Sequence, residues 1–266
     1  MNGTPDIGAF NLAAAYLLAV PPLMIVLWLG APLAGRIIAG LARMTLQLVL
    51  VGLYLEALFR WNNPWLTLLW IGVMIGVAES SILRGCSLKM RRFTLPLAAA
   101  LAAGTLLPLG AFLLIILRTQ PVLDARYAVP IGGMILGNCL RANIVGINHF
   151  FDALRRNEKT HLLALARGAG LAESLRPCFR GAIQAALTPT IAMMSTIGIV
   201  SLPGMMTGVM LGGADPLVAI KYQLAIMLAI FSGTAVTVFL GIYLSIRPGF
   251  DAYGLLRRDN FRNELK

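Results

Sequence analysis

The sequence has few charged residues for its length. They make up 12% of its 266 residues, whereas a soluble domain usually carries about 25%. Hydrophobic residues make up 58% of the chain, and several apolar runs approach the roughly 20 residues that cross a bilayer core. The composition therefore excludes an ordinary soluble domain. It predicts an all-α fold, a polytopic transmembrane helical bundle that forms one membrane-embedded domain over residues 1–266.

Cysteine and histidine are also scarce. Cys86, Cys139 and Cys178 stand apart, with no C-x-x-C pair, so we expect neither a disulfide nor a zinc site. His149 and His161 are the only histidines, and the sequence contains no recognisable Ser/His/Asp or Cys/His catalytic pattern. The chain also has no G-x-x-x-x-G-K-S/T phosphate loop. We therefore expect no catalysis, no ATPase activity and no cofactor bound by this chain itself.

Acidic residues are half as numerous as basic ones, which gives a formal net charge of +11. Such a charge can indicate a nucleic-acid partner, but here most Lys and Arg residues lie in alternate short connections between apolar runs. This placement follows the positive-inside bias of membrane proteins, so we expect membrane lipid and no nucleic acid as partner. The bias predicts the N-terminus outside, the C-terminus inside and an odd number of spans.

We expect about seven spans. The first apolar run follows a segment without Lys or Arg, so we expect it to stay as a span rather than serve as a signal peptide. Gly30–Ala42 is expected to form an inner connector or an interfacial helix. Five spans are the alternative, if the chain around Ser201 is re-entrant. The seven run roughly over Leu12–Leu29, Leu41–Phe59, Trp65–Ala78, Phe93–Leu117, Val129–Ile147, Gly181–Val200 and Leu217–Ile246.

Span five carries a stripe of polar residues. At about 100° per residue they fall on one broad helical face, and a central arginine costs about 2.5–3.5 kcal/mol to insert. One interpretation is a translocation pathway or gate. The other is an ion pair or hydrogen bond inside the bundle, with Glu56 or Glu79 as partner. A free metal cation would require Arg141 to be neutralised, whereas a chelated or anionic cargo would fit it better. The stripe consists of Asn138, Arg141, Asn148, His149 and Asp152.

Spans two and three contain a few further polar residues. Glu56 and Glu79 are the acids closest to the membrane core in this topology. Carboxylates suit hard cations and proton coupling, so these two are the candidate metal contacts, with an interfacial charge as the alternative for each. Arg43 and Gln47 are four residues apart and share a helical face. For a glutamine within a span we favour an interhelical hydrogen bond.

A Gly/Pro/Met-rich segment follows span six. Its Pro and Gly residues indicate a broken helix between Ser201 and Thr207. Irregular backbone at membrane depth is tolerated only where it is buried in protein or lines a cavity. Methionines here could form a path for soft metal ions, but packing is their commoner role and we favour it. We therefore predict an outer gate that includes Pro203, Gly204, Met205 and Met206.

A short basic segment rich in small residues, Ala164–Pro177, lies on the predicted inner side. Small residues let one helix approach another closely, so this segment is suited to sit in a groove of a partner protein and couple the chain to it. A basic interfacial loop is the alternative. The predicted coupling residues are Ala164, Ala166, Arg167, Gly168 and Ala169.

Three stretches of the sequence resemble the signature of a known family. Val200–Gly208, Gly213–Pro216 and Ile220–Gln223 are similar to the corresponding stretches of the FetB-type iron-export ABC permeases, a family that includes plant aluminium-tolerance permease subunits. Ala164–Gly170 also resembles a segment of this family, although Arg167 stands where the family has an apolar residue.

The resemblance implies an ABC transporter permease subunit in the bacterial inner membrane. Two copies would pair as a homodimer with two copies of a separate ATP-binding subunit, which would hold ATP-Mg. The exported cargo would be iron or a related metal ion, moved when the partner dimer closes on ATP and pushes the coupling segment. Another cargo, such as a nucleotide sugar or a metal chelate, is one alternative. An ATP-independent channel or scaffold is the other.

Overall fold

The computed structural model describes residues 8–86, 88, 90–118, 123–251 and 253–257. These residues form helices and no named strand, which confirms the predicted all-α fold. The only extended pairings among them are two isolated bridges. The elements are α1 (Ala9–Ala15), a 3₁₀ turn η1 (Tyr16–Ala19), α2 (Val20–Trp28), α3 (Ala34–Trp61), α4 (Pro64–Gly85), α5 (Met90–Ala111), a π-helical turn η2 (Phe112–Leu117), α6 (Ala125–Arg156), α7 (Glu158–Ala166), α8 (Leu171–Thr196), α9 (Gly204–Leu211) and α10 (Pro216–Gly249).

The described chain contains 6 helical segments that are long and apolar enough to cross a membrane. They are Phe10–Trp28, α3, α4, Arg92–Leu117, α6 and α10. The predicted sixth span falls in α8, which has 26 residues but is not among these segments, since Arg180, Gln184 and Thr188 interrupt its apolar residues. The chain is therefore a multi-pass membrane protein.

Several predicted helix boundaries are wrong for local reasons. The backbone of Gly30 takes a left-handed turn (φ 64°), and α3 then runs unbroken from Ala34, so Gly30–Ala42 is not a separate connector. Helix α4 continues to Gly85, which places Glu79 inside the helix and not beyond the predicted end of span three at Ala78. Helix α8 begins at Leu171, so the last part of the predicted coupling segment is already helical.

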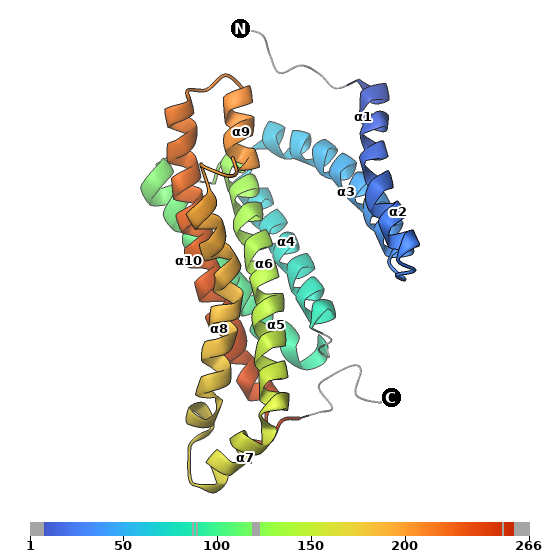
Figure 1. The fold of residues 1–266 in the computed structure, drawn as a ribbon. Coiled ribbons are helices and arrows are strands. Elements are labelled where there is room, and N and C mark those ends of the chain that lie inside the picture. Colours follow the sequence, from blue (N-terminus) through green and yellow to red (C-terminus); the bar gives the residue numbers. More distant parts are fainter. Residues whose placement is uncertain (1–7, 87, 89, 119–122, 252, 258–266) are drawn as a thin grey trace.

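The bundle packs α5, α6 and α8 against α10, the long helix at the end of the chain, and α4 packs against α5 and α6 (Figure 1). Its closest crossing joins α5 and α10. A Cβ added at Gly104 would lie 2.5 Å from Cβ of Thr237 and 2.8 Å from the carbonyl oxygen of Gly233. Small residues allow two membrane helices to meet backbone to backbone in this way. Beside the crossing, Asn143 of α6 donates a hydrogen bond of 2.9 Å to Oγ1 of Thr237, so three helices are held at one buried point.

The first helices form an arm that stands off from this bundle (Figure 1). The apolar windows of Phe10–Trp28 and α3 are 0% buried within the chain. The arm is joined to the bundle near the end of α3, where Leu58 is buried with Ala125 and Val129 of α6. The rings of Tyr54 and Trp70 stack there with centroids 4.0 Å apart. The apolar faces of the arm are therefore left for lipid or for a second protein chain.

The long helices alternate in direction, so their connections gather at two ends (Figure 1). The turn from α4 to α5, helix α7 and the end of α10 lie at one end, and α9 lies at the other. The predicted coupling segment and the predicted outer gate are thus at opposite ends of the bundle.

Candidate functional site

The five predicted coupling residues lie together in the last turn of α7 and the loop that joins it to α8, a segment called here the coupling turn (Ala164–Gly170). Gly168 has a left-handed backbone (φ 91°). Its N–H donates to the carbonyl of Leu165 at 3.0 Å, and the N–H of Ala169 donates to the carbonyl of Ala164 at 3.0 Å. This pair of bonds is the Schellman motif, which ends a helix with glycine in the left-handed position. Arg167 and Gly168 are exposed, so the turn presents a compact, basic protrusion to any partner.

A second segment, called here the C-terminal turn (residues 250, 251 and 253–257), packs against α7 and the start of α8 on either side of the coupling turn. His161 of α7 is buried, and its Nε2 lies 2.9 Å from the carbonyl oxygen of Gly254. A Cβ at Gly254 would meet Leu165 at 3.1 Å and Leu171 at 3.4 Å, so the glycine lies between α7 and the start of α8. The turn closes back on α10, because the N–H of Arg257 donates to the carbonyl of Gly249 at 2.9 Å. Helix α7, which ends in the coupling turn, is thus linked to α10 through the C-terminal turn.

Replacing His161 with alanine should loosen this connection. The variant loses one buried hydrogen bond and leaves a cavity beside Phe250, whose ring centroid lies 6.0 Å from that of His161. Together these changes cost about 2 kcal/mol. Hydrogen exchange should become faster at the amides of Gly254 and Leu255, while His161→Gln, whose amide N–H can still donate to Gly254, should keep most of the protection. Unchanged hydrogen exchange at Gly254 and Leu255 in His161→Ala would contradict a stabilising contact between His161 and the C-terminal turn.

The polar stripe of α6 divides into two parts. Arg141, near the midpoint of the helix, is exposed and donates from Nη2 to Oδ1 of Asn138 at 3.1 Å. Towards the α7 end, Asn148 donates to the carbonyl of Gly85 at 3.4 Å, and the ring of His149 lies against Gly181 of α8. Within the described chain Arg141 therefore pairs along its own helix, and its predicted alternative partners, Glu56 and Glu79, do not form an ion pair with it.

A cavity of about 820 Å³ separates α3 from α4 and α6. Arg43 and Gln47 line it from α3, Ser81 from α4, and Gly137 and Leu140 from α6. Both α3 side chains are exposed, and the interhelical hydrogen bond predicted for Gln47 is not formed in the part of the chain that the structure describes. The four-residue spacing of Arg43 and Gln47 correctly predicted that both lie on one face of α3. That face lines a cavity because α3 tilts away from the bundle.

The structure does not bring the two predicted metal contacts together. Glu56 lies exposed on α3. Glu79 is buried at 5% exposure on α4, and its Oε1 has no hydrogen-bond partner among the described residues. No group of three or more His, Cys, Asp or Glu residues in the described chain could hold a metal ion. A resting metal site on these residues therefore has no structural support, and their contact with a passing cation stays a prediction.

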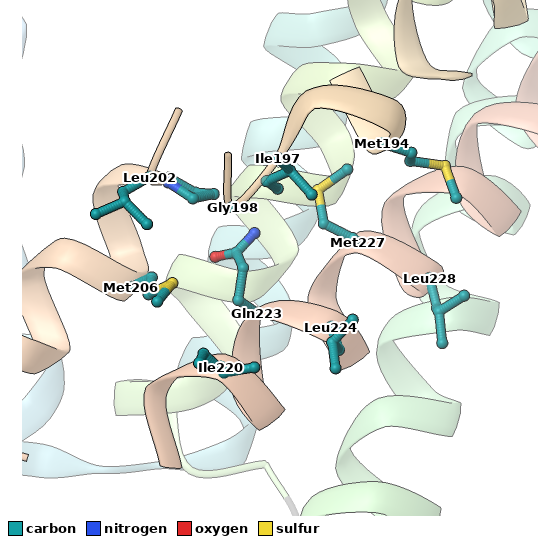
Figure 2. Close-up of a pocket in the computed structure, with 11 residues that line it drawn as sticks. Met194, Ile197, Gly198, Leu202, Met206, Ile220, Gln223, Leu224, Met227 and Leu228 are labelled. Atoms are coloured by element: carbon teal, nitrogen blue, oxygen red, sulfur yellow. The ribbon is translucent and has the colours of Figure 1, made fainter. Parts of the chain in front are cut away.

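The predicted outer gate is more regular than expected. Between α8 and α9 the chain is non-helical from Ile197 to Pro203, and α9 begins with Gly204 in an ordinary helical turn. The prediction of broken backbone as far as Thr207 is therefore wrong, because proline is well tolerated at the start of a helix. Met205 packs against the core. Pro203 and Met206 face a pocket of about 310 Å³ between α8, α9 and α10 (Figure 2).

The three cysteines are buried free thiols in the structure. Cys86 follows the last residue of α4, and burial together with the negative charge of Asp152 raises the pKa of its thiol to about 12. Only the thiolate is strongly nucleophilic, and a pKa so far above neutral leaves almost no thiolate at pH 7.

A variant that keeps Cys86 as its single cysteine should therefore resist N-ethylmaleimide in the folded state at pH 7. Labelling should become fast only after denaturation, or as the pH rises towards 12. Ala166→Cys in a cysteine-free background serves as the exposed control, because Ala166 lies on the surface of α7. Equal labelling rates for the two folded variants would contradict the burial of Cys86.

Comparison with known proteins adds family membership to this geometry. The model of the family described as Uncharacterised protein family (UPF0014) matches residues 9–250. The chain belongs to this family. The match covers every helix described above, from α1 to α10. Together with the relatives named below, it confirms the predicted family resemblance. No solved structure matches the chain.

The relatives of this chain include bacterial and plant proteins. A UPF0014 membrane protein of Synechocystis is 33% identical over 203 residues, which cover 76% of this chain and 78% of the relative. The probable iron export permease protein FetB of Escherichia coli is 28% identical over 243 residues, covering 91% of this chain and 92% of that protein. The protein ALUMINUM SENSITIVE 3 of Arabidopsis thaliana is 29% identical, covering 80% of this chain and 76% of the plant protein.

Sequence reasoning missed two features of the sites. It did not identify His161 and Gly254 as partners, because they are 93 residues apart and neither belongs to a recognisable motif. It quoted Gln223 only as part of the family signature, and the structure places this residue in the pocket beside α9. A glutamine within an apolar run is the one sequence signal that could have drawn attention to it.

Proposed function

We propose that this chain is the permease subunit of an ABC transporter that exports iron or a related metal ion. The observation that carries the proposal is the match over 91% of this chain with the E. coli protein named as a probable iron export permease. The energy would come from ATP-Mg on a separate ATP-binding subunit, because the chain has no phosphate loop of its own. The chain itself would bind no cofactor and catalyse no reaction.

In this proposal α8 is the seventh span, and the N-terminus lies outside the bacterial inner membrane. The alternating helix directions support it, since α7 and the end of α10 lie at one end of the bundle and α9 at the other (Figure 1). The α7 end carries the basic residues Arg155, Arg156, Lys159 and Arg167, as the positive-inside bias requires of a cytosolic end. That end would face the ATP-binding subunit.

Two copies of the chain would form the pathway. A charged side chain near the centre of a spanning helix faces protein or a water-filled cavity, because exposure to lipid is costly. Arg141 is exposed at this depth in the single chain, and the cavity beside α3 is open on the same side of α6. A second copy laid against α6 would cover Arg141 and enclose the cavity.

The coupling turn would receive the push of the ATP-binding subunit. Gly168 and Ala169 shape this turn through backbone hydrogen bonds of 3.0 Å. His161 carries the movement to the C-terminal turn and so to α10 through its contact with Gly254. Because α10 contacts α5, α6, α8 and α9, a shift at its inner end would reach the outer gate.

One observation favours a different cargo as the second candidate. The described residues that line the cavity include Arg43 and no acidic residue. A bare cation would be repelled there, whereas a metal chelate or a nucleotide sugar presents oxyanions that an arginine binds well. An ATP-independent channel or scaffold remains the alternative from another class.

These three proposals can be distinguished by the ATPase activity of the permease purified in lipid together with its ATP-binding subunit. Stimulation by Fe(II) supports the proposal, and Glu56→Gln or Glu79→Gln should weaken it if these carboxylates touch the ion. Stimulation only by a chelate or a UDP-sugar moves the assignment to the second candidate, with Arg43 and Arg141 as its residues. Failure of any ATP-binding protein to copurify from native membranes would point to the channel or scaffold.

A further inference from the structure

The pocket beside α9 has the composition of a small-molecule site. It encloses about 310 Å³, which falls within the range of ligand pockets. Met194, Ile197 and Leu202 line one side, Met206 the α9 side, and Met227 and Leu228 the α10 side. These side chains carry no charge, so the pocket is suited to a neutral, apolar body.

One polar side chain points into this pocket. Gln223 lies on α10 with 8% of its surface exposed, and its Oε1 has no hydrogen-bond partner among the described residues. Figure 2 shows the amide standing in the pocket between Met206 and Met227. A buried carbonyl without a donor is unfavourable, so the site is incomplete until a donor reaches Oε1.

Three simpler occupants fit less well. A soft metal ion could use the thioethers of the methionines, but its first ligands must converge to about 2.3 Å, and the pocket is far wider than such a shell. A bound water needs two to four polar partners, whereas Gln223 is the one polar side chain among the lining residues. A lipid tail would fill the volume and leave Oε1 of Gln223 without a donor.

We propose that this pocket binds a small neutral organic molecule with an apolar body and a single N–H or O–H donor, held by the carbonyl of Gln223. Such a ligand contacts α8, α9 and α10 at once and holds α9 against α10. The inference goes beyond the proposed export activity and does not depend on it, because binding requires neither ATP nor the ATP-binding subunit.

Equilibrium dialysis with the permease in lipid nanodiscs, against empty nanodiscs as background, measures this binding. The probes are pairs that differ only in the donor: indole with 1-methylindole, phenol with anisole, and 1-hexanol with hexyl methyl ether. We expect at least one donor-bearing probe to bind saturably and about tenfold more tightly than its methylated partner, as one hydrogen bond to a buried group allows. In Gln223→Leu the two members of that pair should bind within about twofold of each other.

Gln184→Leu is the matched control, because Gln184 is exposed on α8 and does not line the pocket. It should keep the preference for the donor. Gln223→Leu removes a buried carbonyl without a partner, so this variant should fold at least as well as the parent. The proposal is overturned if no donor-bearing probe binds above empty nanodiscs, or if Gln223→Leu keeps the full preference. If the protein binds the donor-bearing probe selectively but does not export a metal ion, the result counts against the export proposal alone.

Discussion

Gly168→Val is expected to abolish ATP-driven transport while the protein stays folded and inserted in the membrane. The backbone of Gly168 is left-handed (φ 91°), a conformation that costs a residue with a Cβ about 1–2 kcal/mol and more when the residue is β-branched. That energy shifts the turn away from its observed shape by about 5- to 30-fold in population. No atom lies within 4 Å of the added Cβ, so the damage is to the turn and not to the core.

The ratio of transport to ATP hydrolysis in reconstituted vesicles measures this effect, and we expect ATP hydrolysis to continue without transport. Gly170→Ala is the matched control, because Gly170 has an ordinary backbone (φ −67°) and also has no atom within 4 Å of an added Cβ. Normal transport by Gly168→Val would show that the turn between α7 and α8 does not transmit the energy of ATP.

Gly104→Val is expected to prevent the bundle from forming. Even a single Cβ at this position would lie 2.5 Å from Cβ of Thr237 and 2.8 Å from the backbone of Gly233. The obstacle includes backbone, which cannot turn aside as a flexible side chain does. Overpacking of this kind costs about 3 kcal/mol or more, and it separates the two helices that carry the central contacts of the fold. The measurement is the yield of monodisperse protein in mild detergent and its thermal unfolding.

Gly110→Val on the same helix provides the comparison. A Cβ at Gly110 has no atom within 4 Å, so this variant should express and unfold like the parent. Equal behaviour of Gly104→Val and Gly110→Val would contradict the close crossing of α5 and α10.

The apolar runs predicted most of the helices, because length and hydropathy alone decide whether a segment can cross a bilayer. They did not predict the ends of those helices. Local backbone choices set these ends, such as the cap in which the Asp124 side chain accepts from the N–H of Arg126 at 3.0 Å. Nor could they show that Gly204 starts a regular helix, since Pro and Gly next to each other read equally well as a break or as a helix start.

The candidate sites also divide into features that local sequence predicts and features that depend on contacts between distant segments. That the predicted coupling residues lie together follows from their being consecutive, and that the stripe shares one face of α6 follows from the helical repeat of 3.6 residues. Two contacts depend on where segments far apart in the sequence meet, and no local sequence pattern predicts them. They are the hydrogen bond between His161 and Gly254 and the position of Gln223 in the pocket beside α9. The cavity beside Arg43 and Gln47 likewise exists only because α3 stands away from α4 and α6.

ATP-dependent uptake of iron by inverted membrane vesicles tests the central claim most directly. Vesicles that contain this chain and its ATP-binding subunit should accumulate Fe(II) when ATP is supplied, because export from the cell is uptake into an inverted vesicle. Vesicles with Gly168→Val should not accumulate it, and those with Gly170→Ala should. Iron uptake that is the same with and without ATP, or no uptake by vesicles that hydrolyse ATP, would contradict an ATP-driven iron exporter.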